Sequence, residues 1–110
     1  MKLPNAENAV VDIKKLRDYC LSSEHRRGKH KAQVFAAVFQ LTAQDSEELQ
    51  KTLLSAARTE DAVPTEEDEY GRRYILDFLL RRENRQAMVR SCWIIRRGET
   101  FPRLTSCYIL

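Results

Sequence analysis

The residues best suited to chemistry on a phosphate group lie in two separate parts of the chain. Both histidines, His25 and His30, fall within residues 24–31 together with four cations. These cations are Arg26, Arg27, Lys29 and Lys31. A second group near the C-terminal end consists of Arg103, Thr105 and Tyr108. Histidine transfers protons near neutral pH, and lysine and arginine neutralise anionic oxygens, so these residues predict a site for a phosphate-bearing ligand.

Side chains of these types can in principle cleave RNA without a metal ion. The 2′-hydroxyl needs a base, the phosphorane needs cationic donors, and the leaving 5′-oxygen needs an acid. Each residue also has an ordinary structural interpretation. A histidine in a loop can simply be solvated, Arg103 can pair with an acid, and Tyr108 can be a core or edge aromatic residue.

Other kinds of site have little support in the sequence. Three glycines, at 28, 71 and 98, do not form a phosphate-binding loop, and no serine stands in a nucleophile-elbow context. The three cysteines, at 20, 92 and 107, are odd in number and widely spaced, which disfavours a disulfide framework. No Cys-x-x-Cys pair is present to seed a zinc site. We therefore expect neither a metal ion nor a cofactor.

Hydrophobic spacing predicts the elements that position these residues. A helix over 12–21 is capped by Asp12, and a second helix over 29–41 buries Phe35 and Phe39. A third helix begins at Asp45, where a capping box is formed with Glu48. The period then changes from 3.6 to 2, which predicts strands near 74–79, 87–97 and 103–110.

Short links between these strands favour an antiparallel meander. The predicted fold is therefore α+β, with about three N-terminal helices packed on a C-terminal antiparallel sheet of three to four strands. In the last strand, strict alternation places Arg103, Thr105 and Cys107 on one face. Leu104, Ser106 and Tyr108 would then lie on the other face.

Charge is unevenly distributed, although the net charge is only +3. Residues 60–69 contain six acids and no base, and we expect them to form a loop. Residues 72–103 contain nine arginines against three acids. An arginine-rich sheet suits an anionic partner, because guanidinium groups pair with phosphate. The alternative is a solvated arginine face that the acidic loop partly neutralises.

Length and composition are those of an ordinary globular protein. The chain has 110 residues, of which 43% are hydrophobic and 32% charged, and we expect residues 1–110 to form a single domain. No apolar run approaches the ~18 residues of a membrane span. The first residues lack the apolar core of a signal peptide, so a cytoplasmic location is expected.

Several segments resemble one uncharacterised bacterial domain family, which occurs as stand-alone chains and at the C-termini of polymorphic toxins. They include Glu-His-x-x-Gly-x-x-Lys-Ala-x-Val-Phe at 24–35 and Glu-Tyr-Gly-x-Arg-Tyr at 69–74. A longer segment is Trp-Ile-Ile-x-x-Gly-x-x-x-Pro-Arg-Leu-Thr-Ser-Cys-Tyr at 93–108. Toxin-borne members are similar to the barnase, EndoU, colicin and RelE group of small metal-independent ribonucleases.

The resemblance implies a ribonuclease-like toxin domain that acts on RNA phosphodiesters. Lys31 and Arg103 would neutralise the phosphate, Thr105 would orient it, and His30 or His25 would transfer protons. Substrate-binding roles would fall to Arg26, Arg27, Lys29 and Tyr108. Two alternatives stay open: a non-catalytic accessory or antitoxin-like module that binds an acidic partner, and an enzyme acting on another phosphate-bearing molecule such as a dinucleotide. A toxin would also have a cognate antitoxin or immunity protein.

Overall fold

The computed structural model describes residues 1–24, 26, 27 and 29–110. Helices precede a four-stranded antiparallel sheet in the order β1-β2-β3-β4, as the predicted α+β fold requires. The helices are α1 (Ile13–Lys15), α2 (Lys29–Phe39) and α3 (Ser46–Thr59). The short helical turn η1 (Ala6–Asn8) precedes α1, η2 (Leu16–Cys20) follows it, and η3 (Ala43–Asp45) precedes α3. The strands are β1 (Val63–Asp68), β2 (Gly71–Arg82), β3 (Arg85–Arg96) and β4 (Arg103–Ile109). None of the helices in the described residues is long and apolar enough to cross a membrane.

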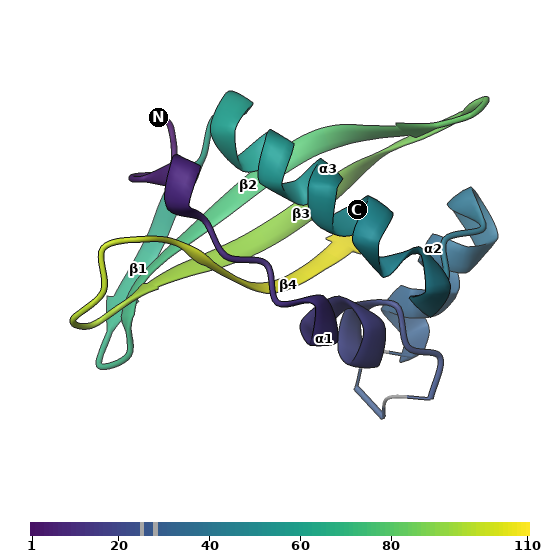
Figure 1. Cartoon of the computed structure of the whole chain (residues 1–110), viewed down its shortest axis with the longest axis horizontal. Helices are drawn as coiled ribbons and strands as arrows, with labels where there is room; N and C mark the ends of the chain where they lie inside the picture. The colour runs from purple at the N-terminus through teal and green to yellow at the C-terminus, as the bar shows by residue number, and fades with distance from the viewer. Residues whose placement is uncertain (25, 28) are drawn as a thin grey trace.

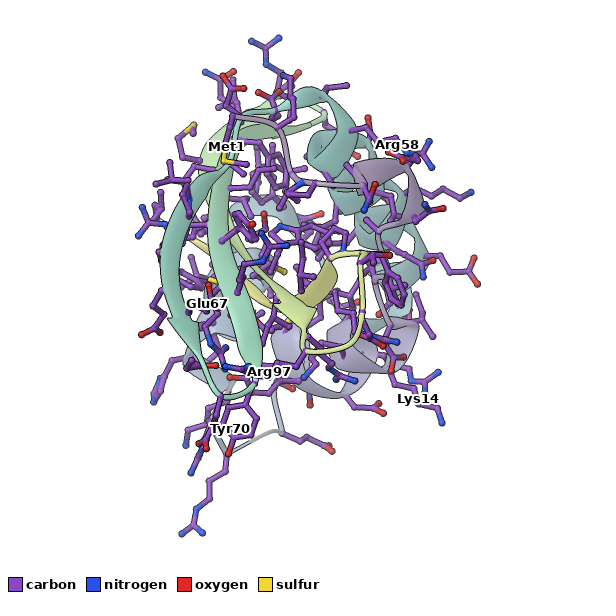
Figure 2. The ribbon with its side chains drawn as sticks, turned by 90° about the vertical axis from the view of Figure 1, so that its left-hand side faces the viewer. Met1, Lys14, Arg58, Glu67, Tyr70 and Arg97 are labelled. Carbon is purple, nitrogen blue, oxygen red and sulfur yellow. The ribbon has the colours of Figure 1, made fainter. Side chains whose placement is uncertain are left out.

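The helix α3 lies across one face of the sheet (Figure 1). Figure 2, turned by 90°, shows β1 and β2 on one side of the molecule and α3 on the other. Leu49 and Leu53 of α3 are buried four residues apart, in the same hydrophobic cluster as Leu76 and Phe78 of β2. Burying each such side chain contributes about 1.5–3 kcal/mol, so this interface holds the two layers together.

The first helical segment begins as predicted, because the Asp12 carboxylate accepts a hydrogen bond from the Lys14 N–H at 2.9 Å. After Lys15 the helix widens into the π-helical turn η2, which the Leu21 N–H closes on the Leu16 carbonyl at 2.8 Å. A wider turn changes which side chains share a face, and such turns often occur at functional sites.

The helix α2 is attached to the sheet at two points. Phe35 and Phe39 lie four residues apart, and both are buried in the core. At its C-terminal end, Arg82 donates to the Phe39 carbonyl at 2.7 Å, and Arg85 donates to the Val38 carbonyl at 2.8 Å. Guanidinium groups at this end satisfy free carbonyls and favour the helix dipole. The hairpin between β2 and β3 thereby fixes the helix that carries Lys31.

The third helix starts where predicted, with Asp45 as the N-cap residue of α3, but its capping differs from the prediction. The capping box uses Thr42 and Asp45 rather than Asp45 and Glu48. The Thr42 N–H donates to the Asp45 carboxylate at 2.9 Å, and η3 leads directly into α3. Glu48 instead accepts a hydrogen bond from Arg82 at 2.8 Å, because the sheet offers it a charged partner.

The acidic stretch is not the predicted loop, because its central part forms the edge strand β1. Pairing with β2 gives these residues backbone partners, although the register shifts between Pro64 and Glu67. Asp68 also accepts a hydrogen bond from Arg73 at 2.8 Å. Tyr70 projects from the turn between β1 and β2 (Figure 2), where its carbonyl accepts from the Arg97 N–H at 3.0 Å.

The predicted alternation along β4 is wrong because the strand contains an irregularity. Cys92 faces Ser106, but its neighbour Trp93 faces Leu104, so Thr105 is the extra residue of a bulge. As a result Leu104 and Cys107 are both buried, although they are three residues apart.

Candidate phosphate-binding site

An open basic depression lies where the first helical segment, the loop before α2 and strand β4 meet. Lys15, Tyr19, Arg27 and Thr105 line it, and its volume is about 380 Å³. Lys15 and Arg27 are exposed, whereas Tyr19 and Thr105 are partly buried. The Nζ atom of Lys15 lies 5.9 Å from the centre of the Tyr19 ring. Two cations and two hydroxyl groups thus share one hollow, which suits an anionic ligand.

Lys31, in the first turn of α2, contacts the same strand β4 that carries Thr105. Its Nζ atom stands 4.3 Å from the centre of the Tyr108 ring, which is a cation–π contact. Both Lys31 and Lys15 affect the buried thiol of Cys20. Its pKa is lowered chiefly by a hydrogen bond from the Cys107 side chain, and both ammonium groups lower it further.

A row of polar side chains crosses the sheet face opposite α3 and ends at Tyr108. Asp77 faces Arg90 between β2 and β3, and Arg90 faces Tyr108 between β3 and β4. Two hydrogen bonds of 2.9 and 3.0 Å join Arg90 to Asp77. The pKa of Arg90 is raised mainly by Asp77 and also by the Tyr108 hydroxyl. Tyr108 is therefore held between two cations, Arg90 and Lys31.

Thr105 is the residue of the predicted C-terminal group that enters the depression. Its position at the bulge turns its hydroxyl toward β3, where it donates to the Cys92 carbonyl at 3.1 Å. The bulge thus explains how a residue of β4 comes to line a hollow beside η2.

Arg103 is turned to an internal acid rather than to the depression. Its guanidinium makes two hydrogen bonds to Glu99, each 2.9 Å long, and its Cζ atom lies 5.0 Å from the centre of the Phe101 ring. Arg103 faces Ile94 on β3, whereas Tyr108 faces Arg90, which is roughly 13 Å further along that strand. The structure brings Thr105 to Arg27 and Lys31 to Tyr108, but it leaves Arg103 with Glu99.

The remaining predicted residues lie on the exposed surface around the start of α2. Arg26, Lys29 and His30 are all exposed, and His30 is the second residue of the helix. His25 and Gly28 lie outside the described residues. Among the residues that are described, no three His, Cys, Asp or Glu side chains gather so that they could hold a metal ion.

Comparison with known domain families finds one family whose model matches nearly the whole chain. The model of a domain of unknown function, DUF6883, matches residues 2–110. The chain belongs to the DUF6883 family. No curated protein and no solved structure matches it. The DUF6883 match includes every segment that lines the depression, from the first helix to β4.

Several arginines of the sheet region of the DUF6883 domain bind acidic side chains or backbone carbonyls of the chain itself. Four of them make ion pairs: Arg73 with Asp68, Arg82 with Asp45 and Glu48, Arg90 with Asp77, and Arg103 with Glu99. Two more, Arg85 and Arg97, donate to backbone carbonyls. Four of the nine arginines in residues 72–103 thus have an acidic partner within the chain. Further exposed cations, Arg26, Lys29 and Lys31, lie near the start of α2.

The pair of Glu99 and Arg103 stabilises the fold near neutral pH and loses this effect in acid. The pKa of Glu99 lies below its ordinary value, first because Arg103 donates hydrogen bonds to it. A lowered carboxyl pKa gives stability that is fully present above the ordinary value and is lost as the pH falls through the folded-state value. We expect Glu99→Gln to be less stable than the wild type at pH 7, with the difference disappearing in acid.

Urea unfolding of both proteins between pH 7 and pH 2 measures this effect. Glu7→Gln, at an exposed position in η1, is the matched control and should follow the wild-type profile. A constant difference between Glu99→Gln and the wild type at every pH would contradict the assignment of the titration to this pair.

Three residues of the site were missed by sequence reasoning: Lys15, Tyr19 and Arg90. Lys15 and Tyr19 are four residues apart on a predicted helix, and this spacing already places them on one face. For Arg90 the sequence holds no comparable signal, because its neighbour Tyr108 depends on the register of β3 and β4.

Proposed function

We propose that this DUF6883 domain acts on RNA phosphodiesters as a small ribonuclease-like domain of the toxin type, with the basic depression as its substrate site. The observation that carries the proposal is the meeting of Lys15, Arg27 and Thr105 from three separate segments, with Lys31 against Tyr108 on the same strand as Thr105. Cations held around an open hollow favour a phosphate backbone over a neutral ligand. A toxin of this kind would be held inactive by a cognate antitoxin or immunity protein.

In this proposal the cations bind phosphate and stabilise the charge that builds up on it. Lys15, Arg27 and Lys31 offer ammonium and guanidinium donors, and the Thr105 hydroxyl orients a phosphate oxygen. His30, at the exposed start of α2, would take the proton of the ribose 2′-hydroxyl. The 2′-oxygen then bonds to phosphorus as the 5′-oxygen leaves with a proton, which yields a 2′,3′-cyclic phosphate.

Removing either lysine should weaken RNA binding by at least about tenfold. A hydrogen bond to a charged group contributes about 1.5–3 kcal/mol, and 1.4 kcal/mol corresponds to tenfold in affinity. Loss of one phosphate contact should also reduce the slope of log affinity against log salt by about 0.7 for single strands. Fluorescence anisotropy with a labelled single-stranded RNA at several salt concentrations measures both quantities for Lys15→Ala and Lys31→Ala.

Lys51→Ala is the matched control, because it removes the same charge from an exposed position on α3. It should leave both the affinity and the salt slope close to wild type. Equal losses of affinity in all three variants would mean that net charge alone attracts RNA. The depression would then not be the RNA-binding site.

Cleavage needs a separate test, in which purified protein is incubated with total RNA in the presence of a chelator. We expect fragments ending in cyclic phosphate from the wild type and few from Lys31→Ala or His30→Ala. Intact RNA with every protein, together with unchanged binding, would reject the ribonuclease and leave a binding domain.

That second candidate, a non-catalytic interaction module for an acidic partner, is favoured by one specific observation. Among the described residues that line the depression there is neither a histidine nor a carboxylate. A hollow with cations and hydroxyl groups but no strong proton acceptor is better suited to holding an anion than to cleaving it. Binding of an acidic peptide in preference to RNA, lost in Lys15→Ala and Lys31→Ala, would support this module.

A further inference from the structure

A row of exposed apolar side chains crosses the sheet face opposite α3, near the hairpin between β2 and β3. Leu79 faces Met88 across the two strands, and the Leu110 N–H donates to the Met88 carbonyl at 3.0 Å. The exposed fractions of these three residues are 41%, 43% and 59%. Their neighbours Phe78 and Val89 are buried, because successive side chains of a strand point to opposite faces. The three residues therefore form one uncovered apolar row.

Two further rows continue this face toward β1. The polar row of Asp77 and Arg90 comes next, and a second apolar row follows, in which Ile75 faces Cys92 and both are partly buried. Adjacent rows are two residues apart along a strand, or about 7 Å. Two hydrogen bonds already join Asp77 to Arg90, so a partner could cover this pair without leaving a charge uncompensated.

The inner face of the same sheet shows what covers such a surface. There α3 places Leu49 and Leu53 in the hydrophobic core, and its Glu48 accepts a hydrogen bond from Arg82 at 2.8 Å. Arg81 is the preceding residue on β2, so its side chain points to the outer face. It is exposed, and in the described part of the chain it has no ion pair or hydrogen bond. The outer face thus repeats the combination of apolar side chains and arginine, but without a helix.

We propose that this outer face binds an acidic amphipathic helix of a partner protein. Apolar side chains of the helix would cover Leu79 and Met88, and one of its carboxylates would pair with Arg81. A helix fits because the middle of a sheet face offers no free backbone groups, and a helix satisfies its own. The carboxylate is required by charge, since the same face of a second copy would offer the Arg81 cation again.

The geometry of the rows suits a helix of this kind. A helix of three turns spans roughly 16 Å, enough to cross all three rows. The residues that would contact it are separate from Lys15, Arg27 and Thr105 of the depression. This inference therefore does not rest on the proposed action on RNA.

The two methionines of the chain make the binding measurable by methyl NMR. Met88 lies in the row, whereas Met1 contacts Ala62 before β1 and serves as the internal reference. The probe is a synthetic helical peptide as long as α3, 14 residues, with leucines on one face and glutamates elsewhere. Its addition should shift the Met88 methyl signal and leave that of Met1 unchanged. The same peptide with lysines in place of glutamates should bind at least about tenfold more weakly.

Variants at exposed positions separate charge from apolar contact. Arg81→Glu should weaken binding of the acidic peptide on the order of tenfold and strengthen binding of the lysine peptide. Leu79→Ser should weaken binding of both peptides. Arg58→Glu is the matched control, because it makes the same charge change at an exposed position near the end of α3 and should behave as the wild type.

Four outcomes would overturn the inference. They are an unshifted Met88 signal at peptide concentrations up to about 1 mM, equal binding of the two peptides, a Met88 shift on concentrating the protein alone, and tighter binding to anionic lipid vesicles than to the acidic peptide. A Met88 shift that is lost in Lys15→Ala but kept in Arg81→Glu would also overturn it, because the peptide would then bind in the depression.

Discussion

Replacing Gly71 with alanine should lower the free energy of unfolding by about 2–6 kcal/mol. A Cβ atom at this position would lie 2.1 Å from the Ile95 carbonyl oxygen and 2.9 Å from the Arg96 Cα atom. Both are backbone atoms of the paired strand β3, so they cannot move without breaking the sheet. The φ angle of +149° is itself a conformation that side chains disfavour.

Over-packing costs about 1–3 kcal/mol and a disfavoured backbone conformation costs about 1–3 kcal/mol, so we expect a loss of about 2–6 kcal/mol. Urea unfolding followed by circular dichroism measures it. Gly98→Ala is the matched control, since its φ of +81° is also unusual but no atom lies within 4 Å of the added Cβ. It should lose only about 1–2 kcal/mol. Equal losses at the two positions would show that the close contact with β3 does not determine the cost.

Truncating Phe35 to alanine should cost about 3–5 kcal/mol, the usual range for a fully buried phenylalanine. Its exposed fraction is 0%, and it joins α2 to the core of the sheet. The loss has two parts, because the removed ring no longer leaves water on folding and the remaining cavity lacks contacts. Since the same helix carries Lys31, any folded fraction of this variant should also bind RNA more weakly.

Val34→Ala is the control for this variant, because it shortens the neighbouring side chain on the same helix at a position 41% exposed. It should change the unfolding free energy by less than about 0.5 kcal/mol, as surface substitutions do. Similar losses for Val34→Ala and Phe35→Ala would contradict the observed packing of α2.

Elements with strong local signals could be predicted from the sequence. The cap at Asp12 and the spacing of Phe35 and Phe39 each depend on residues close together in the chain, so their outcome needs no tertiary information. The change of period near residue 71 likewise indicated where β2 begins, although the strand β1 precedes it in the sheet. The antiparallel order followed, because short connections leave few other arrangements.

Features that depend on distant partners could not be predicted. The acids around Glu66 favour a loop by their intrinsic preference, yet pairing with β2 makes them a strand. The bulge at Thr105 adds one residue to β4, and nothing in the local pattern marks it. This one-residue change moves Thr105 to the depression and turns Cys107 into the core.

The candidate site likewise has a part that the sequence predicts and a part that depends on distant partners. The cations at the start of α2 are visible as a cluster in the sequence, and Lys31 does lie beside Tyr108. The pairing of Arg103 with Glu99 follows from a turn whose geometry the sequence does not specify. Its guanidinium would have to leave that carboxylate before it could bind a phosphate.

The contacts of Arg82 and Arg85 with the C-terminal end of α2 link the position of Lys31, at the other end of the helix, to the β2–β3 hairpin. Arg82 and Arg85 flank the two-residue turn between β2 and β3, and both hold the last carbonyls of the helix. The eleven residues of α2 span roughly 16 Å, so a small tilt at the hairpin becomes a displacement of Lys31 at the opposite end. A change in the length of this turn would therefore reposition Lys31 without altering any residue near Lys31 itself.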